Sequence, residues 1–536
     1  MFHKMIIINR AEIGNKFLGR SIILLRNRIF LYATEFFAGM SVMAVELGAS
    51  RLLAPYFSSS QIVWTIIIGT IMIAMALGNV YGGRLADRDS DPARLYRRII
   101  IAALWIAAIP FAGKYIIVLI AGALIKTIDT NLLTAAAFLS CMAIFVYPLF
   151  LLGTVTPCLV KYATDSLEHN GKVVGNLGAF QTIGSIIGTF IPTFVTIPAV
   201  GTAVTFLIFS SILLIIGLIY FVGNKKMIAV STIAFFILSA LGCSGSFAFW
   251  RNDITREDES IYNYLQVRDD ERRTILSTNV MIGVQSIRVK DRNLTGMYYD
   301  YALAAPLLIE RAEKKILILG MGAGTFAERC RHYFPQSEIL GVEIDEKITA
   351  IAREFFRLPS DIPIVTYDGR AFLQSIDQTF DVIMVDAYQD ITIPFQMSST
   401  EFFALVREHL SEDGVLIVNM SLRDDSAGSI NAHLTDTIAA NFSEVRIIDV
   451  YAGSNRELFA ARNVGVLDRL STRAKSIKDA ELQKLMSTIG STWREPATGN
   501  NILTDDRAPV EVLGMRALDK LVQQQLQFYR GIDFNR

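Results

Sequence analysis

The sequence predicts an α-helical transmembrane bundle, followed by a small β-rich subdomain and an α/β domain with a doubly wound parallel sheet. Long apolar runs are concentrated in the first half of the 536 residues, and the whole chain is 52% hydrophobic. In the second half, strand-like and helix-like segments alternate, which is typical of α/β domains. Residues 1–250 have a net charge of +9 and residues 251–536 a net charge of −9, and these cancel over the chain. The two halves are therefore expected to meet different solvents.

Seven segments of the first half are apolar enough to cross a membrane, which takes about 20 residues in a helix. They run over 30–54, 62–81, 99–124, 132–152, 177–200, 203–222 and 227–249. The segment 1–29 is basic and is interrupted by charges before any apolar core develops, so no cleavable signal peptide is expected. We therefore predict a cytoplasmic segment 1–29 and a transmembrane domain 30–250, in a multi-pass protein of the cell membrane.

Basic residues predict the orientation, because short cytoplasmic loops are rich in Lys and Arg. The loops after the second, fourth and sixth segments are basic, whereas the alternate loops contain only Lys126. The basic loops are therefore predicted to be cytoplasmic. A complete seventh crossing then places 251–536 outside, and a re-entrant or interfacial 227–249 leaves it inside. The sequence leaves the side of the second half open.

Glu35 and Glu46 are predicted to lie on one face of the first crossing helix, because their spacing of 11 residues completes three turns. Charged groups at membrane depth are costly and commonly functional. An interhelical ion pair that only stabilises the bundle is an equally weighted alternative.

Metal and disulfide chemistry are not expected. The 4 cysteines form no CxxC pair, and the 5 histidines lack the spacing of metal ligands. Neither a disulfide framework nor a metal site is therefore predicted.

Residues 251–313 are predicted to form the β-rich subdomain. Its short β-prone runs cover 262–267, 273–276 and 285–290. From residue 314 onward, strands are predicted over 315–319, 338–343, 363–365, 381–386 and 414–419, and helices over 326–333, 346–356, 370–376 and 399–409. This alternation predicts a Rossmann-like domain over 314–536, in which ligands bind at the carboxyl ends of the strands.

A glycine turn follows the first of these strands. Gly320, Gly322 and Gly324 form a GxGxG pattern that allows a ligand to approach the backbone closely. Glu343 ends the second strand, where a carboxylate can accept both hydroxyls of a ribose. NAD(P) is a rival ligand, but Thr325 stands where the third glycine of a GxGxxG pattern would fall, and no second nucleotide-binding half follows.

Two further acidic residues end the next two strands. Asp368 with Gly369 is suited to an adenine amino group, and Asp386 lies at the mouth of the same crevice. Carboxylates that merely cap helices are an alternative that is plausible for Asp368 alone. Together with Glu343, these residues favour an S-adenosyl donor, and hence a Rossmann-like domain of the S-adenosylmethionine methyltransferase type.

These motifs resemble the spermidine synthase (polyamine aminopropyltransferase) family, in particular its membrane-fused branch. The resemblance covers about 257–420, where ValGluIleAsp at 342–345 is similar to the ribose motif and TyrAspGly at 367–369 to the adenine motif. ValAspAlaTyr at 385–388 is similar to the strand end that carries the family's catalytic aspartate. The segment 505–511 and the region of Glu35 and Glu46 also resemble the fused branch.

The resemblance implies transfer of an aminopropyl group from decarboxylated S-adenosylmethionine, a co-substrate, to an amine such as putrescine, without a permanently bound cofactor. Asp386 would be the catalytic base. The residues expected to bind the amine are Asn263, Tyr298, Tyr299, Asp300 and Asp390. A membrane and the two small molecules are the expected partners, nucleic acid is not expected, and a homodimer is left open. The acidic second half would attract a polycation.

Several positions depart from the family pattern. Ala323 replaces the glycine-loop aspartate that helps to bind the aminopropyl amine, and Asp390 stands one residue late. Tyr299 replaces a histidine and Asn263 a glutamine. These changes leave two alternatives: a polyamine transporter or sensor that binds without turnover, and an S-adenosylmethionine-dependent methyltransferase.

Overall fold

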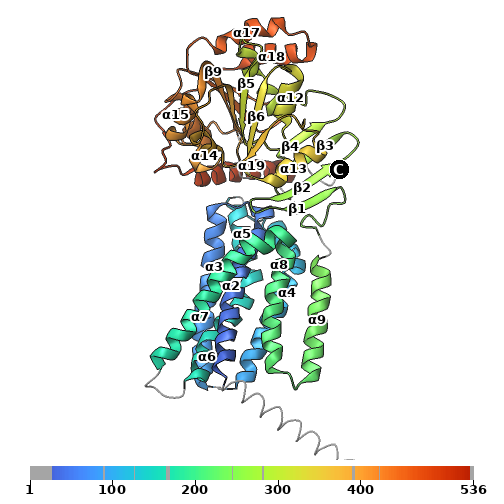
Figure 1. Ribbon diagram of the computed structural model, residues 1–536, viewed down its shortest axis with the longest axis vertical. Coiled ribbons are helices and arrows are strands. Elements are labelled where there is room, and N and C mark those ends of the chain that lie inside the picture. The colour runs from blue at the N-terminus through green and yellow to red at the C-terminus, as the bar shows by residue number, and fades with distance from the viewer. Residues whose placement is uncertain are drawn as a thin grey trace, which may run out of the picture. The chain divides into compact units, whose positions relative to one another are not determined.

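The computed structural model describes residues 27–531 except 89–90, 126, 129, 165–169, 244–245, 281–282, 389–392 and 422, with side chains described as far as residue 524. The chain forms two compact units (Figure 1). The first unit comprises Met1–Trp250 with Asp258–Tyr264, and the second comprises Arg251–Glu257 with Leu265–Arg536.

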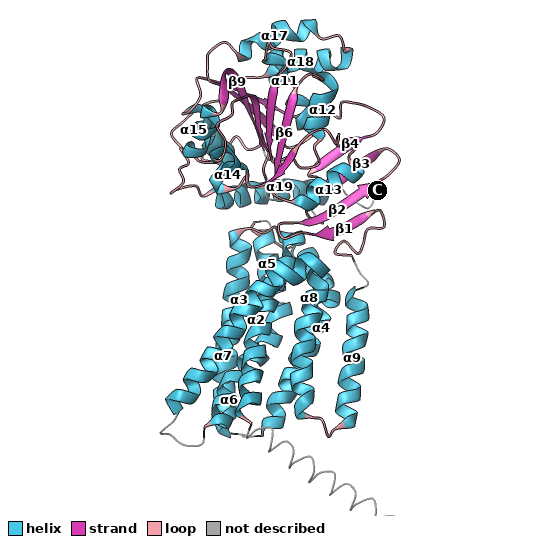
Figure 2. Cartoon of the chain, viewed as in Figure 1, coloured by secondary structure: helices cyan, strands magenta, loops and turns pink. Residues whose placement is uncertain are grey.

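The segment Met1–Trp250 of the first unit is helical, apart from turns and short links, in the part that the structure describes (Figure 2). Its helices are α2 (Arg28–Phe57), α3 (Gln61–Arg88), α4 (Pro92–Leu124), α5 (Leu132–Gly153), α6 (Val155–Ala163), α7 (Asn170–Ile191), the π-helical turn η2 (Pro192–Thr196), α8 (Ile197–Tyr220) and α9 (Lys225–Cys243). Among the described residues, 6 helical stretches have the length and apolar composition to cross a membrane. One of them, Asn170–Tyr220, is 51 residues long.

The 51-residue stretch contains two of the seven crossing segments expected from the sequence. At Gly201 the backbone leaves the helical region, with φ 80° and ψ 170°, so the helices before and after this residue meet at a kink. Glycine adopts this conformation without the steric cost that a Cβ would add. The expected segments 177–200 and 203–222 therefore meet at this kink rather than at a longer loop.

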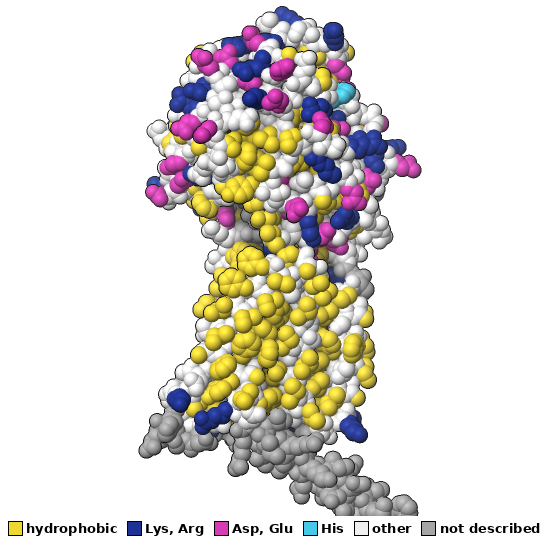
Figure 3. All heavy atoms as spheres, viewed as in Figure 1, with side chains coloured by type: hydrophobic (Ala, Val, Ile, Leu, Met, Phe, Trp, Pro, Cys, Tyr) yellow, Lys and Arg dark blue, Asp and Glu magenta, His cyan; other side chains and the backbone are white. Residues whose placement is uncertain are grey.

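The face of the first unit that Figure 3 shows is largely apolar, with Lys and Arg at one end. Large exposed side chains on α9 include Val230, Ile233 and Phe236, which are 59–67% exposed. Such a surface is suited to lipid. The chain after α9 lies at the end opposite the basic residues, because Tyr56, near the end of α2, donates to Phe247 O at 2.7 Å.

Glu35 lies in the core of the first unit and is 1% exposed. Its Oε1 accepts the hydroxyl of Thr156 at 2.5 Å, whereas Oε2 has no hydrogen-bond partner among the residues that the structure describes. Within the described part of the chain no ion pair of Glu35 is found, so the interhelical ion-pair alternative gains no support at this residue.

The β-rich segment forms a four-stranded sheet in the order β1-β2-β3-β4. The strands are β1 (Arg256–Glu259), β2 (Tyr264–Asp269), β3 (Arg273–Ser277) and β4 (Ser286–Val289). Three of them lie close to the expected runs, and β1 was not expected. Two short helices follow, α10 (Tyr298–Tyr301) and α11 (Ala304–Leu308).

A seven-stranded sheet forms the centre of the second unit, in the order β10-β11-β9-β8-β5-β6-β7. Its strands are β5 (Lys315–Leu319), β6 (Glu338–Glu343), β7 (Ile364–Thr366), β8 (Phe380–Val385), β9 (Leu410–Met420), β10 (Glu444–Asp449) and β11 (Arg456–Ala461). The strands β7, β6, β5, β8 and β9 are parallel, but β11 runs antiparallel to both of its neighbours. The expectation of a wholly parallel sheet is thus corrected to a mixed one.

Helices cover both faces of this sheet, as expected for the Rossmann-like fold (Figure 1). They are α12 (Thr325–Tyr333), α13 (Glu346–Phe355), α14 (Gly369–Gln374), α15 (Thr400–Glu408), α16 (Ile430–Ala439), α17 (Leu470–Arg473), α18 (Ala480–Thr492) and α19 (Val510–Gly531). Because both faces are covered, β8 is buried along its whole length, and its sequence is almost continuously apolar. The main hydrophobic core lies between one face of the sheet and the helices α10, α11 and α12 that cover that face.

Candidate functional site

The glycine turn joins β5 to α12 through backbone conformations that favour glycine. Gly320, Gly322 and Gly324 have φ of 85°, 53° and 74°. A Cβ on Gly320 would lie 2.5 Å from the backbone oxygen of Asp386, so the turn passes directly beside the end of β8. The N–H of Gly320 donates to Val342 O at 2.9 Å and joins the turn to β6. The turn is therefore bounded by the carboxyl ends of β8 and β6.

Glu343 is the last residue of β6, and its carboxylate reaches back to the glycine turn. Oε2 accepts the N–H of Gly322 at 2.8 Å, and Oε1 accepts the N–H of Asp345 at 3.1 Å. The side chain is 7% exposed, and burial raises the pKa of Glu343 to about 7 although both hydrogen bonds lower it. A carboxylate at this position of the fold can accept the hydroxyls of a ribose.

Asp368 lies at the end of β7, where α14 begins. Its Oδ1 accepts the N–H of Ala371 at 2.8 Å, which makes Asp368 the N-cap of α14. Oδ1 of Asp368 thus caps a helix, which is the alternative to adenine binding that the sequence left open for this residue. Gly369, the first residue of α14, lies against the side chains of Met397 and Leu319.

A residue near the C-terminal helix holds the start of α14. Arg370 donates to both oxygens of Asp505 at 2.7 Å, and the hydroxyl of Ser399 donates to Asp505 at 2.5 Å. The guanidinium lowers the pKa of Asp505 to about 2. Segment 505–511, which resembles the fused proteins, therefore fixes the helix beside the expected adenine position.

Asp386 follows β8 and is oriented by two residues from distant parts of the sequence. Its N–H donates to Leu319 O at 2.9 Å, beside the glycine turn. The hydroxyl of Tyr298 donates to Oδ2 at 2.7 Å, and Nδ2 of Asn419 donates to Oδ1 at 2.7 Å. Each carboxylate oxygen therefore accepts one fixed hydrogen bond, from α10 on one side and from β9 on the other.

The surroundings of Asp386 change its acidity. Burial raises the pKa of Asp386 to about 6, although the hydrogen bonds from Asn419 and Tyr298 lower it. The pKa of Tyr298 lies well above its usual range, because of burial and because of the charge of Asp386. Tyr298 thus remains a donor, while Asp386 is ionised at neutral pH and close to the point at which it takes up a proton.

Tyr299 and Asp300 make their hydrogen bonds elsewhere. The Tyr299 hydroxyl donates to Ile287 O at 2.6 Å. Asp300 is 0% exposed and accepts the N–H groups of Thr295 and Gly296 at 2.5 and 2.6 Å. Tyr299 is thus bonded to β4, and Oδ2 of Asp300 to the segment before α10, whereas Oδ1 of Asp300 accepts no hydrogen bond among the described residues and lies 3.9 Å from Arg329 Nε. The expectation that both residues line the path of the amine stays a prediction.

The structure does not test two other expected amine-binding residues. Asn263 belongs to the segment Asp258–Tyr264, which is grouped with the first unit. Asp390 lies outside the described residues. Tyr298 is thus the expected amine-binding residue that the described structure does place against Asp386.

Two polar residues of the site were not identified from the sequence. Asn419 ends an expected strand. Its position at the carboxyl end of that strand could have predicted a place in the site. Glu457 lies in β11, a strand that was not expected, directly opposite Asn419 in the antiparallel register. No local pattern marks Glu457, because its position opposite Asn419 depends on the pairing of β11 with β9.

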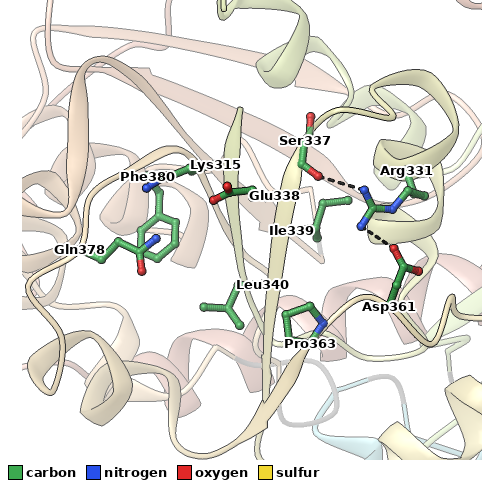
Figure 4. A pocket seen from close by; sticks show the side chains of 10 residues that line it. All are labelled: Lys315, Arg331, Ser337, Glu338, Ile339, Leu340, Asp361, Pro363, Gln378 and Phe380. Carbon is green, nitrogen blue, oxygen red and sulfur yellow. Dashed lines mark hydrogen bonds and ion pairs between the residues drawn. The ribbon is translucent and has the colours of Figure 1, made fainter. Parts of the chain in front are cut away.

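A hollow of about 450 Å³ opens at the opposite end of the strands from the glycine turn (Figure 4). It is lined by the first residues of three strands, Lys315, Glu338 and Phe380, and by Arg331, which pairs with Asp361 at 2.9 Å. These residues lie at the amino ends of the parallel strands. Ligands of this fold bind at the carboxyl ends, so the hollow is not the candidate site.

Comparison with known proteins assigns the family. Residues 297–451 match the family described as the spermine/spermidine synthase domain. A probable polyamine aminopropyl transferase of Bifidobacterium longum is 50% identical over 335 residues, which cover 59% of this chain and 75% of that protein. The chain belongs to the polyamine aminopropyltransferase family. The family predicted from the sequence is thereby confirmed.

Other members of the family are more distant. A polyamine aminopropyltransferase of Vibrio vulnificus is 26% identical over 298 residues, covering 52% of this chain and 97% of that protein. A spermidine synthase solved with the transition-state analogue AdoDATO is 17% identical, with a TM-score of 0.36 over 52% of this chain and 89% of that chain. A probable spermidine synthase of Corynebacterium glutamicum is 18% identical, with a TM-score of 0.35 over 46% of this chain and 96% of that chain.

Proposed function

We propose that the chain is a membrane-anchored aminopropyltransferase that uses decarboxylated S-adenosylmethionine and an amine such as putrescine. The observation that carries the proposal is Asp386, a carboxylate held by Tyr298 and Asn419 directly beside the glycine turn. Family membership supports the type of reaction. Glu343 and Asp368 would hold the nucleoside, at the ends of the next strands.

The reaction forms one bond and breaks another at the same carbon. The amine nitrogen attacks the aminopropyl carbon next to the sulfonium, and the carbon–sulfur electrons return to sulfur. A neutral thioether nucleoside leaves, so the chain supplies no acid to the leaving group. The remaining tasks are to align the two substrates and to take one proton from the nitrogen.

Asp386 is suited to both tasks of the amine site. An alkylamine has a pKa of about 10 and arrives as an ammonium, which a carboxylate attracts. Removal of the proton exposes the nitrogen lone pair, and a base with a pKa of about 6 is poised to accept it. The hydrogen bonds from Tyr298 and Asn419 fix the direction in which the carboxylate faces.

An assay of the purified full chain tests the proposal. The chain is incubated with decarboxylated or intact S-adenosylmethionine and a panel of amines, and products are identified by mass. We expect an aminopropylated amine and a thioether nucleoside in equal amounts from the decarboxylated donor. Methylated product from the intact donor would instead establish the methyltransferase alternative, and binding without product from either donor would establish the sensor alternative.

Cation binding by the helical unit is a second candidate function, which Glu35 favours. Its carboxylate is buried, and one of its oxygens has no hydrogen-bond partner among the described residues. Such an oxygen is free to bind a cation. Uptake of labelled putrescine into vesicles that contain the full chain tests this function. Uptake that is lost in Glu35→Gln, with transfer activity retained, would support it, and absence of uptake by the unaltered chain would contradict it.

A further inference from the structure

Glu457 is a buried carboxylate to which the described residues offer no hydrogen bond. It is 0% exposed, and within the described part of the chain neither of its oxygens accepts a hydrogen bond. A carboxylate in this state is unfavourable unless it takes a proton or meets a cation. Glu444, on the neighbouring strand β10, is also buried, but it accepts the N–H of Leu467 at 3.1 Å and pairs with Arg446 at 3.4 Å.

The place of Glu457 links it to Asp386. In the antiparallel register of β9 and β11, Glu457 is directly opposite Asn419, so the two side chains share one face of the sheet. Asn419 makes no hydrogen bond to Glu457 in the described structure: its Nδ2 donates to Asp386, and its Oδ1 accepts Asn455 Nδ2 at 2.9 Å. The charge of Asp386 adds to burial in raising the pKa of Glu457.

No fixed cation balances this pair of carboxylates in the described residues. Neither Asp386 nor Glu457 forms an ion pair there, and the guanidinium of the adjacent Arg456 is bound to Asp449 at 2.5 Å and Asp425 at 2.7 Å. Two carboxylates in one site, without a basic side chain, provide binding for a ligand that has more than one positive charge.

The strand order shows which end of the site Glu457 occupies. The nucleoside residues belong to β5, β6 and β7, whereas Glu457 lies two strands beyond β8 in the other direction. Two strand spacings amount to about 10 Å. Asp386 therefore lies between the nucleoside side and Glu457.

We infer that Glu457 binds the far ammonium group of a diamine whose near nitrogen is bound and deprotonated by Asp386. The inference rests on the proposed function and makes Glu457 a residue that selects diamines over monoamines. Glu457 also lies beyond residues 297–451, which match the family. Because Glu457 has no exposed surface, a diamine reaches it only when the side chains that cover it rearrange.

Glu457→Gln tests the inference with two acceptors of equal length, putrescine and butylamine. We expect the KM for putrescine to rise about 10-fold to 100-fold, as for loss of a charged hydrogen bond. The kcat for putrescine and the kcat/KM for butylamine should change by less than about twofold. The matched control Glu444→Gln should change neither acceptor, although it should lower the unfolding temperature.

An equal effect of Glu457→Gln on both acceptors, or no effect on either, would overturn the inference. Calorimetric titration with putrescine separates this result from failure of the proposed function. If the unaltered chain makes no product but binds putrescine at least 10-fold more tightly than Glu457→Gln does, the inference stands and the proposed function fails. Equal binding by the two chains contradicts the inference whether or not product forms.

Discussion

At the scale of single residues, Asp386 is a carboxylate whose hydrogen bonds and burial act in opposite directions. Burial favours the protonated form, and the donors Tyr298 and Asn419 favour the ionised form. The result is a pKa of about 6, where a carboxylate is both ionised at neutral pH and basic enough to take up a proton. A fully exposed aspartate would be ionised but would be a much weaker base.

Replacement of Asp386 by Asn should abolish most of the turnover. We expect kcat to fall by about 10²-fold to 10⁴-fold, because the base is lost and the shape is kept. Binding of the adenosyl donor, measured by calorimetry, should be unchanged. Because folding raises the pKa of Asp386, its ionised form destabilises the folded state above about pH 6. At pH 8 the Asp386→Asn variant should therefore unfold at the same temperature as the unaltered chain or at a higher one. Unchanged turnover would remove Asp386 from the role of base.

The pH dependence of kcat/KM should report the same carboxylate. Activity should rise with pH through about 6, because Asp386 accepts a proton only when it is ionised. The Asn419 amide lowers this pKa, so Asn419→Leu should move the rise toward higher pH, by about one unit for loss of one hydrogen bond. A pH profile in which the rise stays in place would show that another group controls it.

At the scale of elements, the site depends on where strands end and helices begin. The glycine turn must pass beside the end of β8, and α14 must begin where Arg370 meets Asp505. In both places a short segment is held by a partner from a different part of the sequence. The geometry for the nucleoside therefore depends on contacts between elements as much as on the motifs themselves.

Gly320→Ala should disturb the turn, and Gly465→Ala provides a matched control. Their φ values are 85° and 87°, but a Cβ on Gly320 would meet the Asp386 backbone at 2.5 Å, whereas nothing lies within 4 Å at Gly465. Both substitutions should lower the free energy of unfolding by about 1–2 kcal/mol because of the left-handed backbone. Gly320→Ala should in addition raise the KM for the adenosyl donor at least about 10-fold. Equal kinetics for the two variants would contradict this account of the turn.

At the scale of the whole molecule, we expect the helical unit to set the side on which the chain leaves the membrane. Lys225 and Lys226 begin α9, and the chain after α9 lies at the opposite end, where Lys114 Nζ donates to Ser246 O at 3.2 Å. A complete helix of 19 residues separates the two ends. With the basic end in the cytoplasm, we expect α9 to deliver the following chain to the other side.

Cysteine labelling tests this orientation in cells that produce the full chain. The exposed Cys243 is first replaced by Ser, because the other three cysteines are buried. Val464→Cys, at a position 78% exposed in the second unit, should react with an impermeant maleimide in intact cells. Lys226→Cys, at the basic end, should react only after lysis. The reverse pattern would show that α9 does not carry the chain across.

The sequence alone determined the two halves, because long apolar runs and alternating strand and helix patterns are local properties. It also located the glycine turn, Glu343, Asp368 and Asp386, because the order of elements brings successive strand ends to one edge. Strands 315–319 and 338–343 were predicted residue for residue. Their apolar content reflects burial on both faces, which a sequence records directly.

The tertiary structure alone decided which polar side chains meet at that edge. Asn419 and Glu457 are opposite one another only because β11 inserts antiparallel beside β9, and no local signal encodes that pairing. Oδ2 of Asp300 is held by the backbone N–H groups of Thr295 and Gly296. Hydrogen bonds between residues distant in sequence set these directions, so they follow from packing and not from residue type.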